Sequence, residues 1–146
     1  MANSGSRSFI DTNILIYAEA SDEPAKRQAA LALLKQRYES ASGVLSTQVL
    51  QEYCNVALKK LKRPAAHVRA QLDLYEQFEI VQVTPAIIRA GLDLHHTRSV
   101  SFYDAIVLAS AQTAGCNELF SEDLNTGEMI GGVRIINPFV QNVSIQ

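Results

Sequence analysis

Short apolar runs alternate along the chain with longer segments in which apolar residues recur every three or four positions. The short runs are predicted as buried strands, and the longer segments are predicted as helices. The predicted strands cover residues 8–10, 44–45, 78–83, 118–120 and 133–136, and the predicted helices cover residues 14–18, 24–38, 48–61, 64–77, 85–97 and 101–114.

Polar residues and prolines mark where these helices begin. Pro24 lies in the first turn of its helix, Ser46 and Thr47 precede the next helix as a plausible cap, and Ser101 opens the last helix. Gly115 is typical of the residue that follows a helix. The resulting order is a strand and two helices, three times over, followed by two further strands.

This order favours a mostly parallel central sheet of about five strands that helices cover on both faces. The length of 146 residues argues for one domain. We expect that domain to span residues 8–140, with residues 1–7 as a flexible N-terminal extension and residues 141–146 as a C-terminal tail. In such sheets a ligand binds beyond the carboxyl ends of the strands, near the point where the strand order reverses.

The composition narrows the classes of protein. Apolar residues make up 47% of the chain, which excludes disorder as the main state. The formal net charge of −2 argues against a nucleic-acid binder that works by charge alone. The charge is uneven, however, with net +3 over residues 59–98 and net −4 over residues 99–146. This asymmetry is either an accident of a small sample or a basic surface beside an acidic pocket.

Cysteine content and hydropathy indicate the cellular compartment in which the protein is expected. Cys54 and Cys116 lie in apolar surroundings and are predicted as buried free thiols, which fits a reducing compartment. The longest apolar run, residues 29–34, is too short to span a bilayer, and the first residues do not resemble a signal peptide. We therefore expect a soluble cytoplasmic protein with no membrane association.

Two aspartates stand out by position. Asp11 follows the first strand, where it is either a helix N-cap or a ligand-binding carboxylate. Asp104 lies in the first turn of a helix that is apolar nearly all round, so its face is predicted to be buried. An unpaired buried charge is costly and needs partners or a metal, unless Asp104 is simply a carboxylate of the capping turn near Ser101.

Two further acids complete the candidate set. Glu52 lies at the border of the apolar face of its helix, and the alternative is an ordinary surface glutamate. Asp123 follows the strand at residues 118–120, in a turn that could equally be solvated. Glu122 is adjacent to Asp123 and leaves the choice of ligand open.

All four acids are expected at one edge of the sheet, where they would repel one another unless a cation neutralises them. Carboxylate oxygens select Mg²⁺ or Mn²⁺ over zinc, and Mg²⁺ often takes further ligands from a phosphate substrate. The chemistry that suits such a site is phosphodiester hydrolysis.

Other motifs point less clearly to chemistry. The chain contains no G-x-S-x-G elbow and no glycine-rich phosphate loop. His95-His96 lacks further zinc ligands at suitable spacing and is interpreted as a polar helix end. Lys59, Lys60, Lys62 and Arg63 form a basic stretch that either contacts RNA or a partner, or stabilises a solvated helix C-terminus.

Five short segments, in this order, resemble the conserved blocks of PIN domains. They are Phe9–Leu15 (FIDTNIL), Gln51-Glu52, Ser101–Ala105 (SFYDA), Ser121–Leu124 (SEDL) and Asn137–Phe139 (NPF). The resemblance covers almost the whole chain, and it implies a three-layer α/β/α sandwich and an endoribonuclease that depends on Mg²⁺ or Mn²⁺.

PIN domains of this size are similar to VapC-type toxins, which usually dimerise and are held inactive by a cognate antitoxin. The resemblance thus implies an RNA substrate, an antitoxin partner and a homodimer. It also implies supporting roles for Asn13 and Ser101, while Glu122 either assists or faces solvent. The metal-binding catalytic residues that it implies are Asp11, Glu52, Asp104 and Asp123.

Two alternatives belong to other functional classes. One is a PIN-like module that binds RNA or a protein without cleavage, and the other is a nuclease that acts on structured DNA. The short chain lacks the insertions expected for threading a DNA flap, which disfavours the second.

Overall fold

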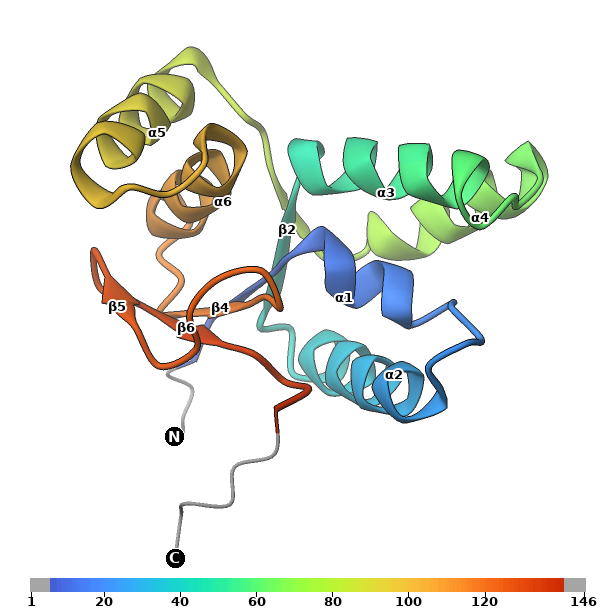
Figure 1. The fold of residues 1–146 in the computed structure, drawn as a ribbon. Coiled ribbons are helices and arrows are strands. Elements are labelled where there is room, and N and C mark those ends of the chain that lie inside the picture. Colours follow the sequence, from blue (N-terminus) through green and yellow to red (C-terminus); the bar gives the residue numbers. More distant parts are fainter. Residues whose placement is uncertain (1–5, 141–146) are drawn as a thin grey trace, which may run out of the picture.

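The computed structural model describes residues 6–140 and is shown in Figure 1. All the predicted helices and strands are present, with ends that shift by a few residues. In chain order the elements are β1 (Ser8–Ile10), α1 (Thr12–Tyr17), α2 (Pro24–Glu39), β2 (Gly43–Ser46), α3 (Thr47–Lys59), α4 (Ala65–Tyr75), β3 (Glu79–Val81), α5 (Pro85–Arg98), α6 (Phe102–Thr113), β4 (Glu118–Phe120), β5 (Met129–Ile130) and β6 (Val133–Ile136).

The strands form one sheet in the order β3-β2-β1-β4-β6-β5. Every neighbouring pair is parallel except β5 and β6, so the prediction of a mostly parallel sheet is confirmed. The chain extends the sheet from β1 through β2 to β3 and then crosses over to add β4 on the other side of β1. The strand order therefore reverses between β1 and β4, which is where such folds bind ligands.

The sheet has six strands rather than about five, because β5 was not predicted. Met129 and Ile130 pair with the start of β6 across a two-residue turn at Gly131-Gly132. Both glycines have positive φ, +56° and +83°, as the tight turns of hairpins require. The Gly-Gly pair was the available signal, but a two-residue strand offers no periodicity to recognise.

Helices lie on both sides of the sheet, which makes a three-layer α/β/α sandwich. In Figure 1, α5 and α6 (yellow to orange) lie on one side, and α1 to α4 (blue to green) lie on the other. The residues from Ala105 to Ala111 are all buried, which confirms the prediction for the last helix. Strand β3 is shorter than predicted because the backbone N–H of Val83 donates to the Thr47 hydroxyl instead of extending the sheet.

Several smaller predictions can be placed on this fold. Cys54 is half-buried and Cys116 is buried, and both are free. Arg7, within the predicted extension, donates to the Ala114 carbonyl at 2.8 Å and so is tied to the domain. Residues 1–5 and the predicted tail at 141–146 lie outside the described residues. Within residues 6–140, no helix has the length and apolar character needed to cross a membrane.

A buried carboxylate ties α1 to the α3–α4 pair. Only 7% of the Glu19 side chain is exposed, and it accepts hydrogen bonds from the Tyr53 hydroxyl, Arg63 and Gln71 and contacts His67 Nε2 at 2.9 Å. Burial alone would raise the pKa of Glu19, but the hydrogen bonds from Tyr53, His67 and Gln71 together lower it. Glu19 thus fixes the end of the helix whose start lies at the carboxyl edge of the sheet.

Replacing Glu19 with alanine should destabilise the domain, because the buried Tyr53 hydroxyl and three part-exposed side chains lose their acceptor. We expect Glu19→Ala to lower the free energy of unfolding by about 3 kcal/mol. Glu39→Ala removes an exposed pair with Lys35 and should cost less than about 0.5 kcal/mol. Urea denaturation measures both, and equal losses in the two variants would contradict the role given to Glu19.

Candidate metal centre and cleft

The predicted acids gather at the carboxyl edge of the sheet, beside the point where the strand order reverses. Asp11 directly follows β1, and Asp123 lies in the loop that follows β4. Helix α6 runs back toward the amino end of β4, so its first turn, which carries Asp104, lies at the same edge. The parallel arrangement of β1 and β4 is what brings together residues more than a hundred positions apart.

Asp11 is the most buried of these acids, with 4% of its surface exposed. Its Oδ1 accepts the backbone N–H of Thr12 at 2.8 Å, and its Oδ2 accepts the hydroxyl of Ser121 at 2.8 Å. Asp11 is therefore the N-cap of α1 and at the same time a member of the acidic group.

The metal-free surroundings disfavour the charge on Asp11. Burial raises its pKa to about 7, against the hydrogen bonds from Ser121 and Thr12, and the nearby charges of Asp123 and Glu52 act in the same direction as burial. A bound cation would offset both the lost hydration and the repulsion.

Asp104 and Asp123 complete a compact group with Asp11. One carboxylate oxygen from each of the three lies within 4.8 Å of the other two. Asp104 is half-buried, and burial together with the charges of Asp123 and Glu52 raises its pKa. Its backbone N–H donates to the Ser101 hydroxyl at 3.1 Å, so the capping turn and the acidic group coincide here as well. Asp123 is exposed and closes the group from the solvent side.

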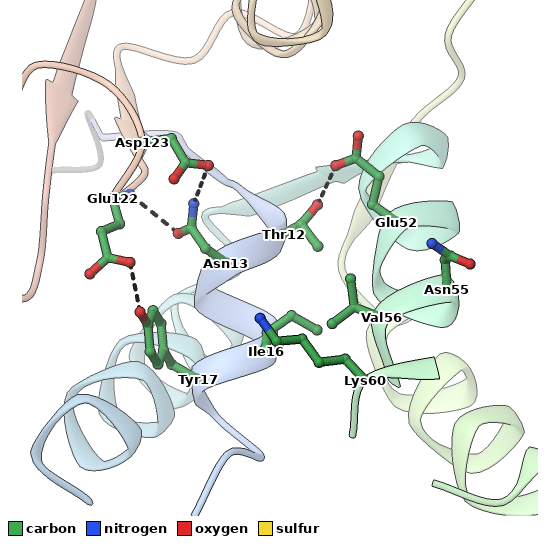
Figure 2. A pocket seen from close by; sticks show the side chains of 10 residues that line it. All are labelled: Thr12, Asn13, Ile16, Tyr17, Glu52, Asn55, Val56, Lys60, Glu122 and Asp123. Atoms are coloured by element: carbon green, nitrogen blue, oxygen red, sulfur yellow. Dashed lines mark hydrogen bonds between the residues drawn. The ribbon is translucent and has the colours of Figure 1, made fainter. Parts of the chain in front are cut away.

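Asn13 and Ser121 hold the loop that carries Asp123. Asn13 Nδ2 donates to Asp123 Oδ2 at 3.1 Å, and its Oδ1 accepts the backbone N–H of Glu122 at 3.2 Å (Figure 2). The buried hydroxyl of Ser121 accepts the backbone N–H of Asp123 at 3.1 Å while it donates to Asp11. The same two side chains thus fix Asp123 relative to Asp11.

Glu52 lies beside the three aspartates but is not one of the compact group. Its Oε1 accepts the Thr12 hydroxyl at 2.8 Å, and its Oε2 accepts Gln48 Nε2 at 3.2 Å (Figure 2 shows the bond to Thr12). The Gln48 amide also donates to the Tyr103 carbonyl at 3.2 Å, which links α3 to the start of α6. Glu52 is therefore held next to the acidic group by hydrogen bonds from two sides.

A cleft of about 370 Å³ opens from this edge and runs between α1 and α3. One part of the cleft is lined by Glu52, Asp123 and Glu122, and another part is lined by Lys60 (Figure 2). Its lining residues are Thr12, Asn13, Ile16, Tyr17, Glu52, Asn55, Val56, Lys60, Glu122 and Asp123.

The four residues of the predicted basic stretch have different surroundings in the structure. Lys60 lines the cleft, and within residues 6–140 no hydrogen bond or ion pair occupies its ammonium group. Lys59 and Lys62 are exposed outside the lining. The guanidinium of Arg63 turns to Glu19, with Nη2 donating to the Glu19 carbonyl at 3.0 Å. Of these four residues, Lys60 is therefore the one placed to meet a ligand in this cleft.

Glu122 is half-buried and faces away from the three aspartates. Its carboxylate pairs with Lys26 at 2.5 Å and accepts the Tyr17 hydroxyl at 2.8 Å. Burial works to raise the pKa of Glu122, but Lys26 and Tyr17 outweigh it and lower the pKa. The Lys26 ammonium also lies over the rings of Tyr17 and Phe139, so the Asn-Pro-Phe segment packs against this ion pair.

Sequence reasoning missed four residues that build the site. Ser121 directly follows β4, and Thr12 directly follows Asp11, the N-cap of α1. These positions could have identified both as candidate site residues. Gln48 precedes Glu52 by one helical turn, which is also a readable spacing. Lys26 carries no comparable signal. His95-His96 ends α5, and His95 Nδ1 contacts the Val100 carbonyl at 2.6 Å, as expected of a polar helix end.

The three aspartates fit a hard divalent cation. All their donor atoms are carboxylate oxygens, which is the donor set of Mg²⁺ and Mn²⁺ and not of a zinc site built on Cys or His. Their ligand oxygens lie within 4.8 Å of one another, close enough to form a candidate site for a metal ion.

The comparisons with known proteins agree with this geometry. The sequence matches the PIN domain family over residues 8–129. No match was found among curated proteins.

Solved structures with a similar fold come from several organisms. A toxin-antitoxin complex from Klebsiella pneumoniae shares 25% identity, with a TM-score of 0.62 over 90% of this chain and 97% of that chain. VapC20 from Mycobacterium tuberculosis, a Sarcin-Ricin loop cleaving toxin, shares 18% identity, with a TM-score of 0.62 over 87% and 98%. VapBC2 from Rickettsia felis, bound to a DNA fragment from its promoter, shares 14% identity, with a TM-score of 0.61 over 88% and 96%. At 18% and 14% identity the likeness concerns the fold.

Without metal, Asp11→Asn should stabilise the protein at pH 8. Because the pKa of Asp11 is raised from 3.8 to about 7 in the folded state, ionisation lowers the free energy of unfolding as the pH rises from 4 to 7, and the loss persists above pH 7. We expect the free energy of unfolding of Asp11→Asn to exceed that of the wild type by on the order of 2 kcal/mol at pH 8, and this difference should disappear near pH 4. Urea denaturation with a chelator present measures both.

The exposed Asp73→Asn is the matched control and should follow the wild type within about 0.5 kcal/mol at each pH. If the free energy of unfolding depended on pH in the same way in Asp11→Asn and the wild type, the destabilising effect assigned to the buried carboxylate would be contradicted.

Proposed function

The chain belongs to the PIN domain family, and we propose that it is a metal-dependent endoribonuclease, the toxin of a VapBC-type toxin–antitoxin pair. The observation that carries the proposal is the group of three aspartates at the carboxyl edge of the sheet, whose exposed member Asp123 lines a cleft of about 370 Å³. This edge is the ligand-binding position of the architecture.

Asp11, Asp104 and Asp123 are the residues that would hold Mg²⁺ or Mn²⁺. When bound, such an ion supplies activation of water and neutralisation of the charge that develops on a phosphodiester. Glu52 is proposed as the fourth acid, because Thr12 and Gln48 orient its carboxylate beside the aspartates. In this position it could accept a proton from an attacking water.

The remaining polar residues keep these acids in place. Asn13 and Ser121 fix Asp123 relative to Asp11, and Ser101 caps the turn that presents Asp104. Glu122 is engaged by Lys26 and Tyr17, so its proposed role is to brace the loop rather than to bind metal.

The cleft is the proposed path of the RNA backbone. Lys60 lines it from the end of α3, and no residue between 6 and 140 engages its ammonium group, so it can neutralise a phosphate beyond the one that is cut. Lys59 and Lys62 contribute at most to the general positive charge of this surface, and Arg63 serves the fold through Glu19.

An antitoxin and a second copy of the chain are the proposed partners. The antitoxin is supported by the similar toxin-antitoxin complex from Klebsiella pneumoniae and by VapBC2 from Rickettsia felis. For a homodimer, α5 offers Ile88 and Leu92, which are 44% and 56% exposed and one helical turn apart. A cytoplasmic location is part of the proposal, because its RNA substrate and its antitoxin are made there.

Removing one aspartate should abolish cleavage and leave the fold intact. We expect Asp104→Asn and Asp11→Asn to lower Mn²⁺-dependent cleavage of RNA by more than about 100-fold, because the group would lose a charged ligand. Asp73→Asn should cleave like the wild type. The assay uses purified protein on RNA, single-stranded DNA and flap DNA, with a chelated sample as the metal-free control.

Three results would overturn the proposal. Wild-type cleavage rates in either aspartate variant would remove the acids from catalysis. RNA binding without cleavage by the wild type would favour a non-cleaving module, and preferred cleavage of flap DNA would favour a DNA nuclease. For the toxin role, expression of the wild type should arrest growth, and co-expression of the small protein encoded beside it should relieve the arrest.

Lys60→Ala should weaken RNA binding, whereas Lys59→Ala should not. Because the Lys60 variant can no longer neutralise one backbone phosphate, we expect its KM to rise about 5- to 10-fold and the slope of log K against log salt to fall by about 1. Both lysines belong to the same basic stretch, so equal effects of the two substitutions would show that general charge, and not the cleft, guides the RNA.

A further inference from the structure

An exposed aromatic residue precedes one of the three aspartates in the sequence. Tyr103 immediately precedes Asp104 in the first turn of α6, and 66% of its surface is exposed. Within residues 6–140 this is the highest value among the exposed large hydrophobic residues. The rest of that helix is buried from Ala105 to Ala111, so Tyr103 contributes little to the core.

The position of Tyr103 is fixed although its ring is exposed. Its backbone carbonyl accepts Gln48 Nε2 at 3.2 Å, and the same amide holds Glu52 at 3.2 Å. Its ring meets Phe102 edge-on, with 5.4 Å between the ring centroids and 68° between the planes. Because two thirds of its surface is exposed, a flat group can still stack on the ring.

Tyr103 and Lys60 lie near opposite ends of α3. Along α3, Gln48 contacts Tyr103, Glu52 follows one turn later, and Lys60 ends the helix. Twelve residues of helix separate Gln48 from Lys60, roughly 18 Å along the axis. Glu52 therefore lies along α3 between the end that contacts the Tyr103 backbone and Lys60, whose ammonium group no described residue pairs with. An aromatic ring and a cation are the two kinds of group that proteins use to hold single-stranded nucleic acid.

We propose that Tyr103 is a stacking platform for an unpaired base next to the phosphodiester that is cut. This inference rests on the proposed function and deepens it, because it assigns a residue that would hold a base of the proposed RNA substrate. Bases are available for stacking on aromatic side chains where they are unpaired, whereas a duplex offers mainly its backbone and 2′-hydroxyl groups. The ring of Tyr103, rather than its hydroxyl, provides the contact.

Kinetics on a short single-stranded RNA tests the platform. Tyr103→Ala should lower kcat/KM by about 5- to 100-fold, the range that corresponds to loss of one stacked base. Tyr103→Phe keeps the ring and should stay within about twofold of the wild type. Tyr38→Ala, which removes another exposed tyrosine on α2, should also leave kcat/KM unchanged. A blunt RNA duplex should be cleaved more slowly than the single strand.

A binding assay separates this inference from the proposed function. The probe is a non-cleavable single-stranded oligonucleotide that carries 2-aminopurine, whose fluorescence falls when it stacks on a tyrosine ring. Binding to the wild type and to Tyr103→Phe should quench it, and Tyr103→Ala should not. If the wild type cleaves no RNA, the proposed function fails, and quenching still decides whether Tyr103 stacks a base.

Four results would overturn the role of Tyr103. The first two are unchanged kcat/KM in Tyr103→Ala and equal quenching by wild type and Tyr103→Ala. The third is the absence, in Tyr103→Ala, of the rise in Tm that Mn²⁺ gives the wild type, since this would show that the ring organises the acids instead of binding RNA. The fourth is a change in oligomeric state in light scattering, which would assign the ring to an interface between copies of the chain.

Discussion

The hydrogen bond from Ser121 to Asp11 joins the ends of the two strands between which the strand order reverses. It holds a carboxylate with only 4% of its surface exposed at the carboxyl edge of the central strand. Because Ser121 also accepts the N–H of Asp123, one hydroxyl group sets the positions of both acids. The cluster thus depends on the parallel pairing of β1 and β4, and a shift in their register would separate its members.

The same arrangement places the fold under electrostatic strain when no cation is bound. Burial and the neighbouring acids raise the pKa of Asp11 to about 7 and also raise that of Asp104. Tightly packed polar sites of this kind cost stability and are typical of places where a protein does chemistry. The overall charge of −2 hides this feature, since the total does not show that three acids are concentrated at one edge.

Residues of other chemical types surround the cleft and support the acidic group. Lys60 lines the cleft on the side of α3, while the Lys26–Glu122 pair, packed against Phe139, braces the loop that carries Asp123. Two charged residues that look alike in the sequence, Glu122 and Asp123, therefore have different tasks. One belongs to an ion pair that supports the loop, and the other belongs to the acidic group.

The sequence alone determined the order of the helices and of every strand except β5, the mostly parallel sheet and the residues at its carboxyl edge, because periodicity and capping are local properties. It also pointed to Asp11, Asp104 and Asp123 through their positions beside strands and helix starts. Only the tertiary structure decided that Glu52 stands outside the compact group, that Arg63 turns inward to Glu19 and that Lys60 lines the cleft. These outcomes depend on which side chains meet across elements far apart in the chain, and spacing along a single helix does not contain that information.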